Sequence, residues 1–234
     1  METLLLIAAE PMEFSGLLRR LPSPEPLRLP VDYASRIKAG DRYWMLVANG
    51  PGPRLAAIAV QAAMAGARVD AIVSTGFCGG LDPVLEAGDV FVADAVLFGS
   101  TGSNPASKPA CSRRHSGGVI VCGDWVIQSV EEKQTVRSKT GASAVDMESG
   151  AVQACARDAR VPFYCVRAVT DTAREGFFLD FNSARDEEGR FVRGRILKAA
   201  LRHPVSGVPE LIRLMRRARM AADALGGFLT ACEF

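Results

Sequence analysis

Short apolar runs alternate with helical patterns along most of the chain, and this alternation constrains the fold more than any other feature. Residues 4–8, 70–75 and 163–169 read as buried strands, while residues 53–66 and 148–160 read as helices. Strands that alternate with helices are typical of α/β proteins with a central sheet. We therefore predict one α/β domain over residues 1–234, a three-layer α/β/α sandwich with a mixed central sheet.

Bulk properties exclude several classes of protein. A chain of 234 residues buries a core large enough to fold without disulfide or metal support. Its net charge of +2 argues against a nucleic-acid partner, since such proteins usually carry a strong basic excess. No apolar stretch reaches the roughly 18 residues of a membrane span, and the N-terminal run, which lacks basic residues, reads as a strand rather than a signal peptide.

The cysteines and histidines predict neither a metal site nor a cofactor. The six cysteines are far apart, without a CxxC pair, and the chain has only two histidines. Several cysteines lie in apolar runs, where a free thiol behaves as a small hydrophobic group. We therefore expect reduced cysteines and a cytoplasmic protein.

Two segments lack regular patterns. Residues 99–118 are rich in Ser, Gly, Pro and Asn, which predicts a mobile loop. Residues 171–189 form a second predicted loop, in which Phe177, Phe178 and Phe181 fit an active-site lid, the core or an apolar binding site.

Two glycine-rich loops follow predicted strands. They contain Gly50, Gly52 and the run from Gly76 to Gly80. Such loops bring backbone amides close to a ligand, and a loop that opens a helix can bind an anion. Each also fits an ordinary tight turn.

Carboxylates cluster at predicted strand ends. Asp146 and Glu148 flank Met147, so their side chains point to the same side of an extended chain and can hold vicinal hydroxyls. A helix cap and a first-turn charge are the alternatives for these two acids. Asp171 follows a buried strand, where α/β folds place ligands, and can serve as a general acid or as a cap. Arg167, four residues earlier, also fits an ordinary ion pair.

Three motifs resemble the purine nucleoside phosphorylase/uridine phosphorylase family, and within it the nucleosidases that hydrolyse methylthioadenosine and S-adenosylhomocysteine. They are TGFCGGLDP at residues 75–83 with GDV at 88–90, VDME at 145–148, and RAVTD at 167–171. The resemblance covers roughly residues 4–171. It implies a nucleoside phosphorylase-like fold, a homodimer and cleavage of an N-ribosidic bond.

The resemblance also assigns roles to residues. Glu148 would bind the ribose hydroxyls, Asp171 would protonate purine N7, Arg167 would support Asp171, and Glu13 would position the attacking water. The remaining substrate-binding candidates are Met147, Asp146, Trp125, Val126, Ile127, Phe77, Cys78, Gly79 and Thr170.

Water and phosphate are both possible nucleophiles. The family's bacterial phosphorylases carry an arginine just before the glycine-rich signature, where this chain has Ser74, and Glu13 would repel phosphate. Both points favour water. Arg54, beside the loop of Gly50 and Gly52, leaves inorganic phosphate open as an alternative. A catalytically silent nucleoside-binding protein is a third hypothesis, against which the set Glu13, Glu148 and Asp171 argues.

The C-terminal part departs from the nucleosidase pattern. It resembles the hopanoid-associated branch of the family, which is thought to remove adenine from adenosylhopane. Residues 185–219 contain ten Lys or Arg against four Asp or Glu, and the helix at 209–225 is amphipathic. Such a helix can associate weakly with an anionic membrane surface, or pack its apolar side on the domain.

Overall fold

The computed structural model describes residues 2–99 and 102–234, and within them ten strands form one sheet. The strands are β1 (Thr3–Ala8), β2 (Glu25–Pro26), β3 (Tyr33–Ala39), β4 (Arg42–Ala48), β5 (Ala71–Gly80), β6 (Val90–Phe98), β7 (Ser103–Pro105), β8 (Ser116–Cys122), β9 (Ala144–Asp146) and β10 (Phe163–Asp171). The helices are the 3-10 helix η1 (Pro11–Phe14), α1 (Ser15–Leu18), α2 (Pro53–Gly66), α3 (Val130–Thr140), α4 (Ser149–Ala159), α5 (Arg193–Arg202) and α6 (Gly207–Leu229).

The sheet is mixed, as predicted. β1 runs parallel to β4 and β5, and β5 runs parallel to β10, whereas β3 pairs antiparallel with β4 and β6 antiparallel with β10. The pairs β10–β6, β6–β8, β8–β9, β9–β5 and β5–β10 close a ring of five strands. This end of the sheet is therefore rolled into a small barrel, which the strand pattern did not predict.

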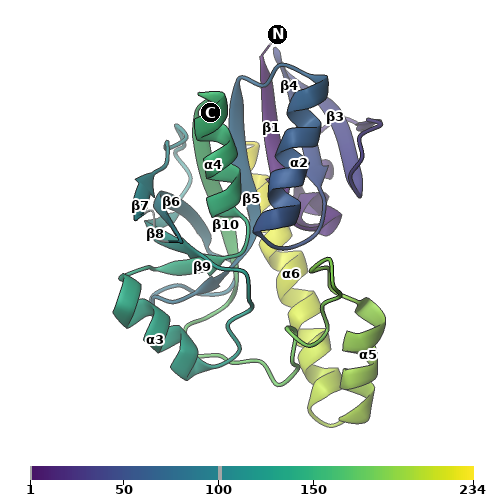
Figure 1. The fold of residues 1–234 in the computed structure, drawn as a ribbon, viewed down its shortest axis with the longest axis vertical. Helices are drawn as coiled ribbons and strands as arrows, with labels where there is room; N and C mark the ends of the chain where they lie inside the picture. The colour runs from purple at the N-terminus through teal and green to yellow at the C-terminus, as the bar shows by residue number, and fades with distance from the viewer. Residues whose placement is uncertain (1, 100–101) are drawn as a thin grey trace.

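Helices cover both faces of the sheet and confirm the three-layer sandwich. Figure 1 shows α2 and α4 side by side on one face, with α6 behind the sheet. One core cluster includes Ala59 of α2 and Val152 of α4, and the other includes Leu225 and Phe228 of α6. Each face buries apolar side chains, which explains why the central strands are continuous hydrophobic runs.

Segments that follow the carboxyl ends of the strands meet at one end of the sheet. η1 follows β1, α4 follows β9, and β10 ends at Asp171. Parallel β5 and β10 end together there, since Asp171 pairs with Gly79, whereas β1 ends earlier, beside Ser74, and η1 continues from it. This is the position at which α/β sheets bind ligands.

The segment predicted as a mobile loop, residues 99–118, is more regular than expected. β7 pairs with the outer half of β6, and β8 begins at Ser116. Residues 100–101 lie outside the described part of the chain. The prediction of a mobile loop is wrong for β7 and the start of β8, because β6 extends to Phe98 and both segments pair with it.

A disulfide joins Cys111 to Cys232. The backbone bridge between Ala110 and Glu233 lies beside it, so the chain before β8 is held against the C-terminus. The expectation that all cysteines are reduced is wrong for this pair, whose partners are 121 residues apart in the sequence. Among the helices that the structure describes, none has the length and apolar character required to cross a membrane.

Candidate active site

The buried Asp146 lies in the wall of one cavity of about 390 Å³ at this end of the sheet. Three further buried carboxylates line the same cavity. They belong to Glu13, Glu148 and Asp171, which are 5%, 5% and 7% exposed. Because the three residues come from η1, the start of α4 and the end of β10, only the fold brings them together.

Backbone amides hold the Glu13 carboxylate in place. One oxygen, Oε2, accepts hydrogen bonds from the amides of Ala9 (2.8 Å) and Glu10 (2.9 Å), and Oε1 accepts one from Phe77 (2.8 Å). Burial raises the pKa of Glu13 above its usual value of 4.5, while these amides and the nearby Arg167 oppose the rise. The side chain is thus rigidly placed and suited to accept a hydrogen bond from a water molecule.

Gly76 makes this placement possible. Its φ is +128°, and a Cβ atom at this position would lie 2.5 Å from Glu13 Oε1 and 2.9 Å from Arg167 Nη1. A residue with a side chain would be strained in its backbone and would displace both charged groups.

Arg167 is the central cation of the site and is completely buried. It forms ion pairs with Asp146 and, at 3.5 Å, with Glu148 Oε2. It also donates hydrogen bonds to the Thr75 carbonyl (2.8 Å) and the Ser74 hydroxyl (2.7 Å). Ser74, which the sequence contrasted with a phosphorylase arginine, therefore serves as a partner of Arg167.

The carboxylate of Asp146 is engaged by internal partners, although the residue lines the cavity. Its side chain is 0% exposed, pairs with Arg167, and accepts hydrogen bonds from the Ser149 amide (3.0 Å) and hydroxyl (2.7 Å). Asp146 therefore makes the contact to the α4 start that the cap alternative expects, although the residue that directly precedes the helix is Glu148. Convergence of Asp146 with Glu148 on a ligand stays a prediction, since both residues line the cavity. Arg167 is fully buried and needs a counter-charge, which Asp146 supplies.

Glu148 is held by Gly52, whose amide donates a hydrogen bond to Oε1 (2.9 Å). Burial raises the pKa of Glu148 from 4.5 to about 7, and the negative charges of Asp146 and Glu13 add to the rise while Arg167 opposes it. A carboxyl group whose pKa is raised this far is typical of functional sites.

Asp171 pairs with a residue that the sequence reasoning missed. Lys133 of α3 is 1% exposed; its Nζ lies 2.5 Å from Asp171 Oδ2 and donates to the Thr172 carbonyl at 2.7 Å. Thr170 donates from its hydroxyl to the other Asp171 oxygen (2.9 Å). The prediction that Arg167 supports Asp171 is wrong, because Arg167 is directed to Asp146 and Lys133 takes its place.

A signal for Lys133 was present in the sequence. It lies three residues from both Val130 and Val136, on the side of α3 that faces the protein. A lysine is almost never fully buried without a partner, so a lysine on the apolar face of a helix indicates a buried carboxylate elsewhere in the chain. Pattern reasoning alone does not say which carboxylate that is.

The other predicted substrate-binding residues line the same cavity. They are Phe77, Cys78, Gly79, Trp125, Val126, Ile127, Met147 and Thr170. A Cβ atom at Gly79 would lie 3.0 Å from Asp171 Oδ2, so a side chain there would push the Asp171 carboxylate aside by a few tenths of an ångström. Trp125 is 55% exposed and stands at the mouth.

One end of the cavity is apolar. Phe177 and Phe181 make an edge-to-face contact with ring centres 5.3 Å apart, and Phe181 contacts Phe191 at 6.2 Å. The predicted loop of residues 171–189 thus contributes its aromatic residues to the wall. The hairpin of α5 and α6 supplies the rest, namely Ile196, Leu211, Leu214 and Ala218.

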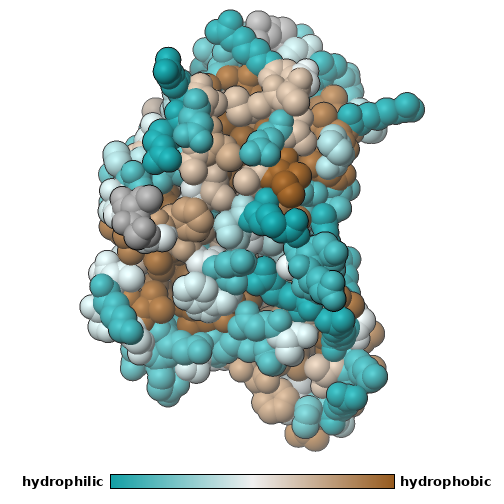
Figure 2. Space-filling view, in the orientation of Figure 1, coloured by the Kyte–Doolittle hydropathy of each residue, from teal (hydrophilic) through white to brown (hydrophobic). Residues whose placement is uncertain are grey.

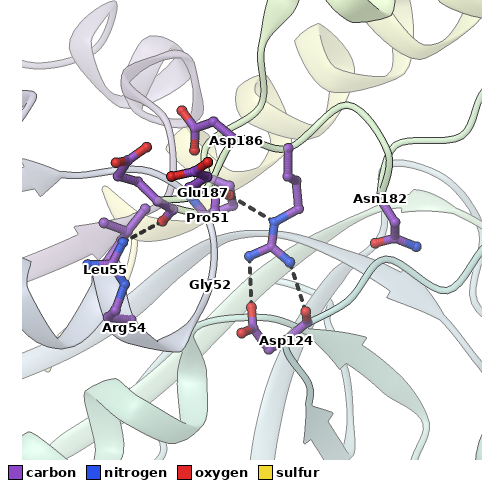
Figure 3. A pocket seen from close by; sticks show the side chains of 11 residues that line it. Pro51, Gly52, Arg54, Leu55, Asp124, Asn182, Asp186 and Glu187 are labelled. Atoms are coloured by element: carbon purple, nitrogen blue, oxygen red, sulfur yellow. Dashed lines mark hydrogen bonds and ion pairs between the residues drawn. The ribbon is translucent and has the colours of Figure 1, made fainter.

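The loop of Gly50 and Gly52 is occupied by internal contacts. The Gly50 amide donates to the Ala9 carbonyl (2.8 Å), and that of Gly52 donates to Glu148. Arg54 points into a neighbouring cavity of about 370 Å³ and donates to the Glu188 carbonyl at 2.6 Å (Figure 3). The prediction of a phosphate loop is not supported by this geometry.

The neighbouring cavity is acidic. Arg185 lines it and donates to Asp124 Oδ1 and to the Asp124 carbonyl, both at 2.8 Å. The other charged residues of its wall are Arg54, Asp186, Glu187 and Glu188. Four carboxylates against two guanidinium groups would repel a phosphate dianion.

Comparisons with known proteins agree with the motifs. The family model described as "Phosphorylase superfamily" matches residues 33–111 and 104–202. The 5'-methylthioadenosine/S-adenosylhomocysteine nucleosidase of Staphylococcus aureus (strain Newman) is 33% identical over 160 residues, covering 57% of this chain and 70% of the relative.

Solved structures share the fold. The S-adenosylhomocysteine nucleosidase from Streptococcus pyogenes, in complex with 5-methylthiotubericidin, matches with a TM-score of 0.70 and 21% identity over 98% of this chain and 96% of that one. The futalosine hydrolase of Helicobacter pylori matches with a TM-score of 0.71 and 17% identity over 98% and 96% of the two chains. The chain therefore belongs to the phosphorylase superfamily and is related within it to the nucleosidases.

Proposed function

We propose that this protein hydrolyses the N-ribosidic bond of an adenine nucleoside that carries an apolar 5′ substituent. The observation that carries the proposal is the single cavity in which Glu13, Glu148 and Asp171 converge beside an apolar wall. The nucleosidase relative supports the reaction type.

Each carboxylate has a distinct role in the proposed reaction. Glu148, with two acceptor oxygens, holds the ribose hydroxyls. Asp171 in its protonated form delivers its proton to N7 of the base, which makes the base a better leaving group, and the Lys133 ammonium then pairs with the carboxylate that remains. Glu13 orients the water that attacks C1′ as the base departs. A ribosyl group leaves with oxocarbenium character, so the nearby negative charges stabilise the transition state.

Water is the proposed nucleophile because the site offers phosphate no free cation. Arg167 is buried behind Asp146 and Glu148, Lys133 is paired with Asp171, and Arg54 lines the neighbouring cavity instead, where it donates to the Glu188 backbone carbonyl. A phosphate dianion would instead meet three carboxylates. Phosphate-dependent cleavage is the second candidate.

The apolar end of the cavity supports a 5′ tail longer than a small group. Its wall extends from Phe177 and Phe181 to Leu211 and Leu214 of α6. A lipid-tailed nucleoside such as adenosylhopane, which the hopanoid-associated branch implies, is the extreme case. A methylthio group would fill only the near part of this wall.

Release of free base tests the proposal. The substrates are adenosine, methylthioadenosine, inosine and an adenosine with a long 5′ alkyl group, each with and without inorganic phosphate. We expect cleavage without phosphate, fastest for the alkylated adenosine. Cleavage that requires phosphate and gives a ribose 1-phosphate product would replace water by phosphate as the nucleophile.

The Asp171→Asn variant separates an enzyme from a binding protein. It keeps the shape of the side chain and removes the proton donor, so we expect turnover to fall by about 10²–10⁴-fold with nucleoside binding retained. If the wild-type protein binds nucleosides but cleaves none of them, the hypothesis of a silent binding protein is correct.

A further inference from the structure

Exposed apolar side chains gather on the hairpin of α5 and α6. Of ten large hydrophobic side chains that are exposed among the described residues, six lie between residues 197 and 220. The five nearest the turn, here called the tip patch, are Leu197, Leu201, Val205, Ile212 and Met215, with exposed fractions from 47% to 90%. Such clustering marks a surface that contacts a partner.

The tip patch lies at the free end of the molecule. Figure 1 shows α5 and the start of α6 extending beyond the body of the domain, and Figure 2 shows brown and tan atoms at that end beside teal ones. Residues 201–206 are all exposed, so this turn has no protein surface over it.

The charge around the tip patch is strongly basic. From residue 191 to residue 222 the chain has eight Lys or Arg and one acid, Glu210. Glu210 is buried, and its two carboxylate oxygens accept hydrogen bonds from the backbone amides of Phe178 and Leu179. Within residues 2–99 and 102–234, no carboxylate pairs with the following four basic side chains: Lys198, Arg202, Arg216 and Arg219.

We propose that the tip patch and its basic rim dock onto an anionic lipid bilayer. Helices whose apolar side chains are flanked by Lys and Arg bind at the surface of membranes with negative headgroups. The inner side of the same hairpin lines the catalytic cavity with Ile196, Leu211 and Leu214. Docking therefore brings the apolar end of the cavity to the bilayer, from which a tailed substrate can enter. This delivery step rests on the proposed function, whereas docking itself does not.

A second copy of the chain fits this surface less well. A two-fold interface places the same patch on both subunits, so the basic rims would face each other. Like charges at short distance repel, and an anionic headgroup layer removes the repulsion. The homodimer that the family resemblance implies would use another face.

Co-sedimentation of the full chain with vesicles tests the proposal. One set of vesicles is phosphatidylcholine alone, and the other contains about one third phosphatidylglycerol. We expect binding to the anionic vesicles that is at least about tenfold tighter and that weakens with salt, because screening shortens the reach of the charges.

Two double variants probe the two components of the surface. Leu201→Asp with Val205→Asp removes apolar contact, and Arg202→Glu with Arg216→Glu reverses charge; each should lower vesicle affinity by about tenfold or more. The matched controls are Val84→Asp, at a 76% exposed position, and Arg157→Glu on α4, which should bind as the wild type does. These positions are exposed, so the variants should fold.

Three results would overturn the proposal. They are no binding of the wild type to either vesicle, equal binding to both, and binding of the tip variants at the wild-type level. Sedimentation without vesicles gives a fourth: if the tip variants turn a dimer into monomers, the patch is a subunit interface. Cleavage of a small soluble nucleoside, measured in the same variants, should be unchanged, which separates a failure of docking from a failure of the proposed function.

Discussion

Glu148 should limit the stability of this protein near neutral pH, and its replacement by glutamine should relieve that limit. The folded protein raises the pKa of Glu148 from 4.5 to about 7, chiefly because the carboxyl group is buried. The protonated form is therefore favoured on folding. The stability that protonated Glu148 contributes is complete below pH 4.5, and it is lost as the pH rises through about 7 and the carboxyl group ionises in the folded protein.

The size of the effect follows from the two pKa values. The interval between 4.5 and about 7 corresponds to about 3 kcal/mol of unfolding free energy once the group is fully ionised in both states. Glu148→Gln keeps the size of the side chain and an oxygen that can accept the Gly52 amide hydrogen bond. At pH 8 the variant should therefore be more stable by up to about 3 kcal/mol, or about 6–12 °C in Tm for a chain of this length.

Denaturant unfolding from pH 5 to pH 8 measures this difference. We expect the stability difference to be small at pH 5 and to grow toward pH 8, while kcat/KM falls by about 10²–10³-fold because the ribose loses its carboxylate. Asp146→Asn is the matched control in the same network. It leaves the buried Arg167 without its main partner and should destabilise the protein by about 3–5 kcal/mol. A glutamine variant that is less stable at pH 8, or a difference that does not change with pH, would refute the reasoning.

Three further predictions concern other parts of the structure. Lys133→Met should lower kcat by about 10²-fold with a smaller effect on KM, because Asp171 loses the cation that pairs with its carboxylate. Steady-state kinetics measures both constants, and an unchanged kcat would show that Lys133 has no role in the reaction. Gly76→Ala should destabilise the protein by about 1–3 kcal/mol and impair cleavage, since the new methyl group meets Glu13; thermal melts and base release measure both effects, and a neutral result would contradict the assigned geometry. Cys111→Ser should lower the unfolding free energy by about 2–4 kcal/mol, because the disulfide closes a long loop, and reductant should do the same to the wild type but not to the variant; equal sensitivity of both proteins to reductant would disprove the link.

The sequence by itself determined the fold class and the main members of the site. Strand periodicity and the order of strands and helices are local properties, so they are readable without the tertiary structure. The motifs around Gly76, Glu148 and Asp171 likewise occupy short segments and identified the family. The resemblance then pointed to Glu13, Glu148 and Asp171, which share a cavity.

Only the tertiary structure decided how the charges are paired. Arg167 lies close to Asp171 in sequence, yet the fold directs its guanidinium group to Asp146 and Glu148, and it brings Lys133 from a separate helix to Asp171. Burial makes an unpaired charge costly, so each buried ion takes the partner that the packing places within reach rather than its neighbour in the chain. The closed strand ring, the disulfide and the apolar tip of the α5–α6 hairpin are likewise products of contacts between distant segments, which no local pattern records.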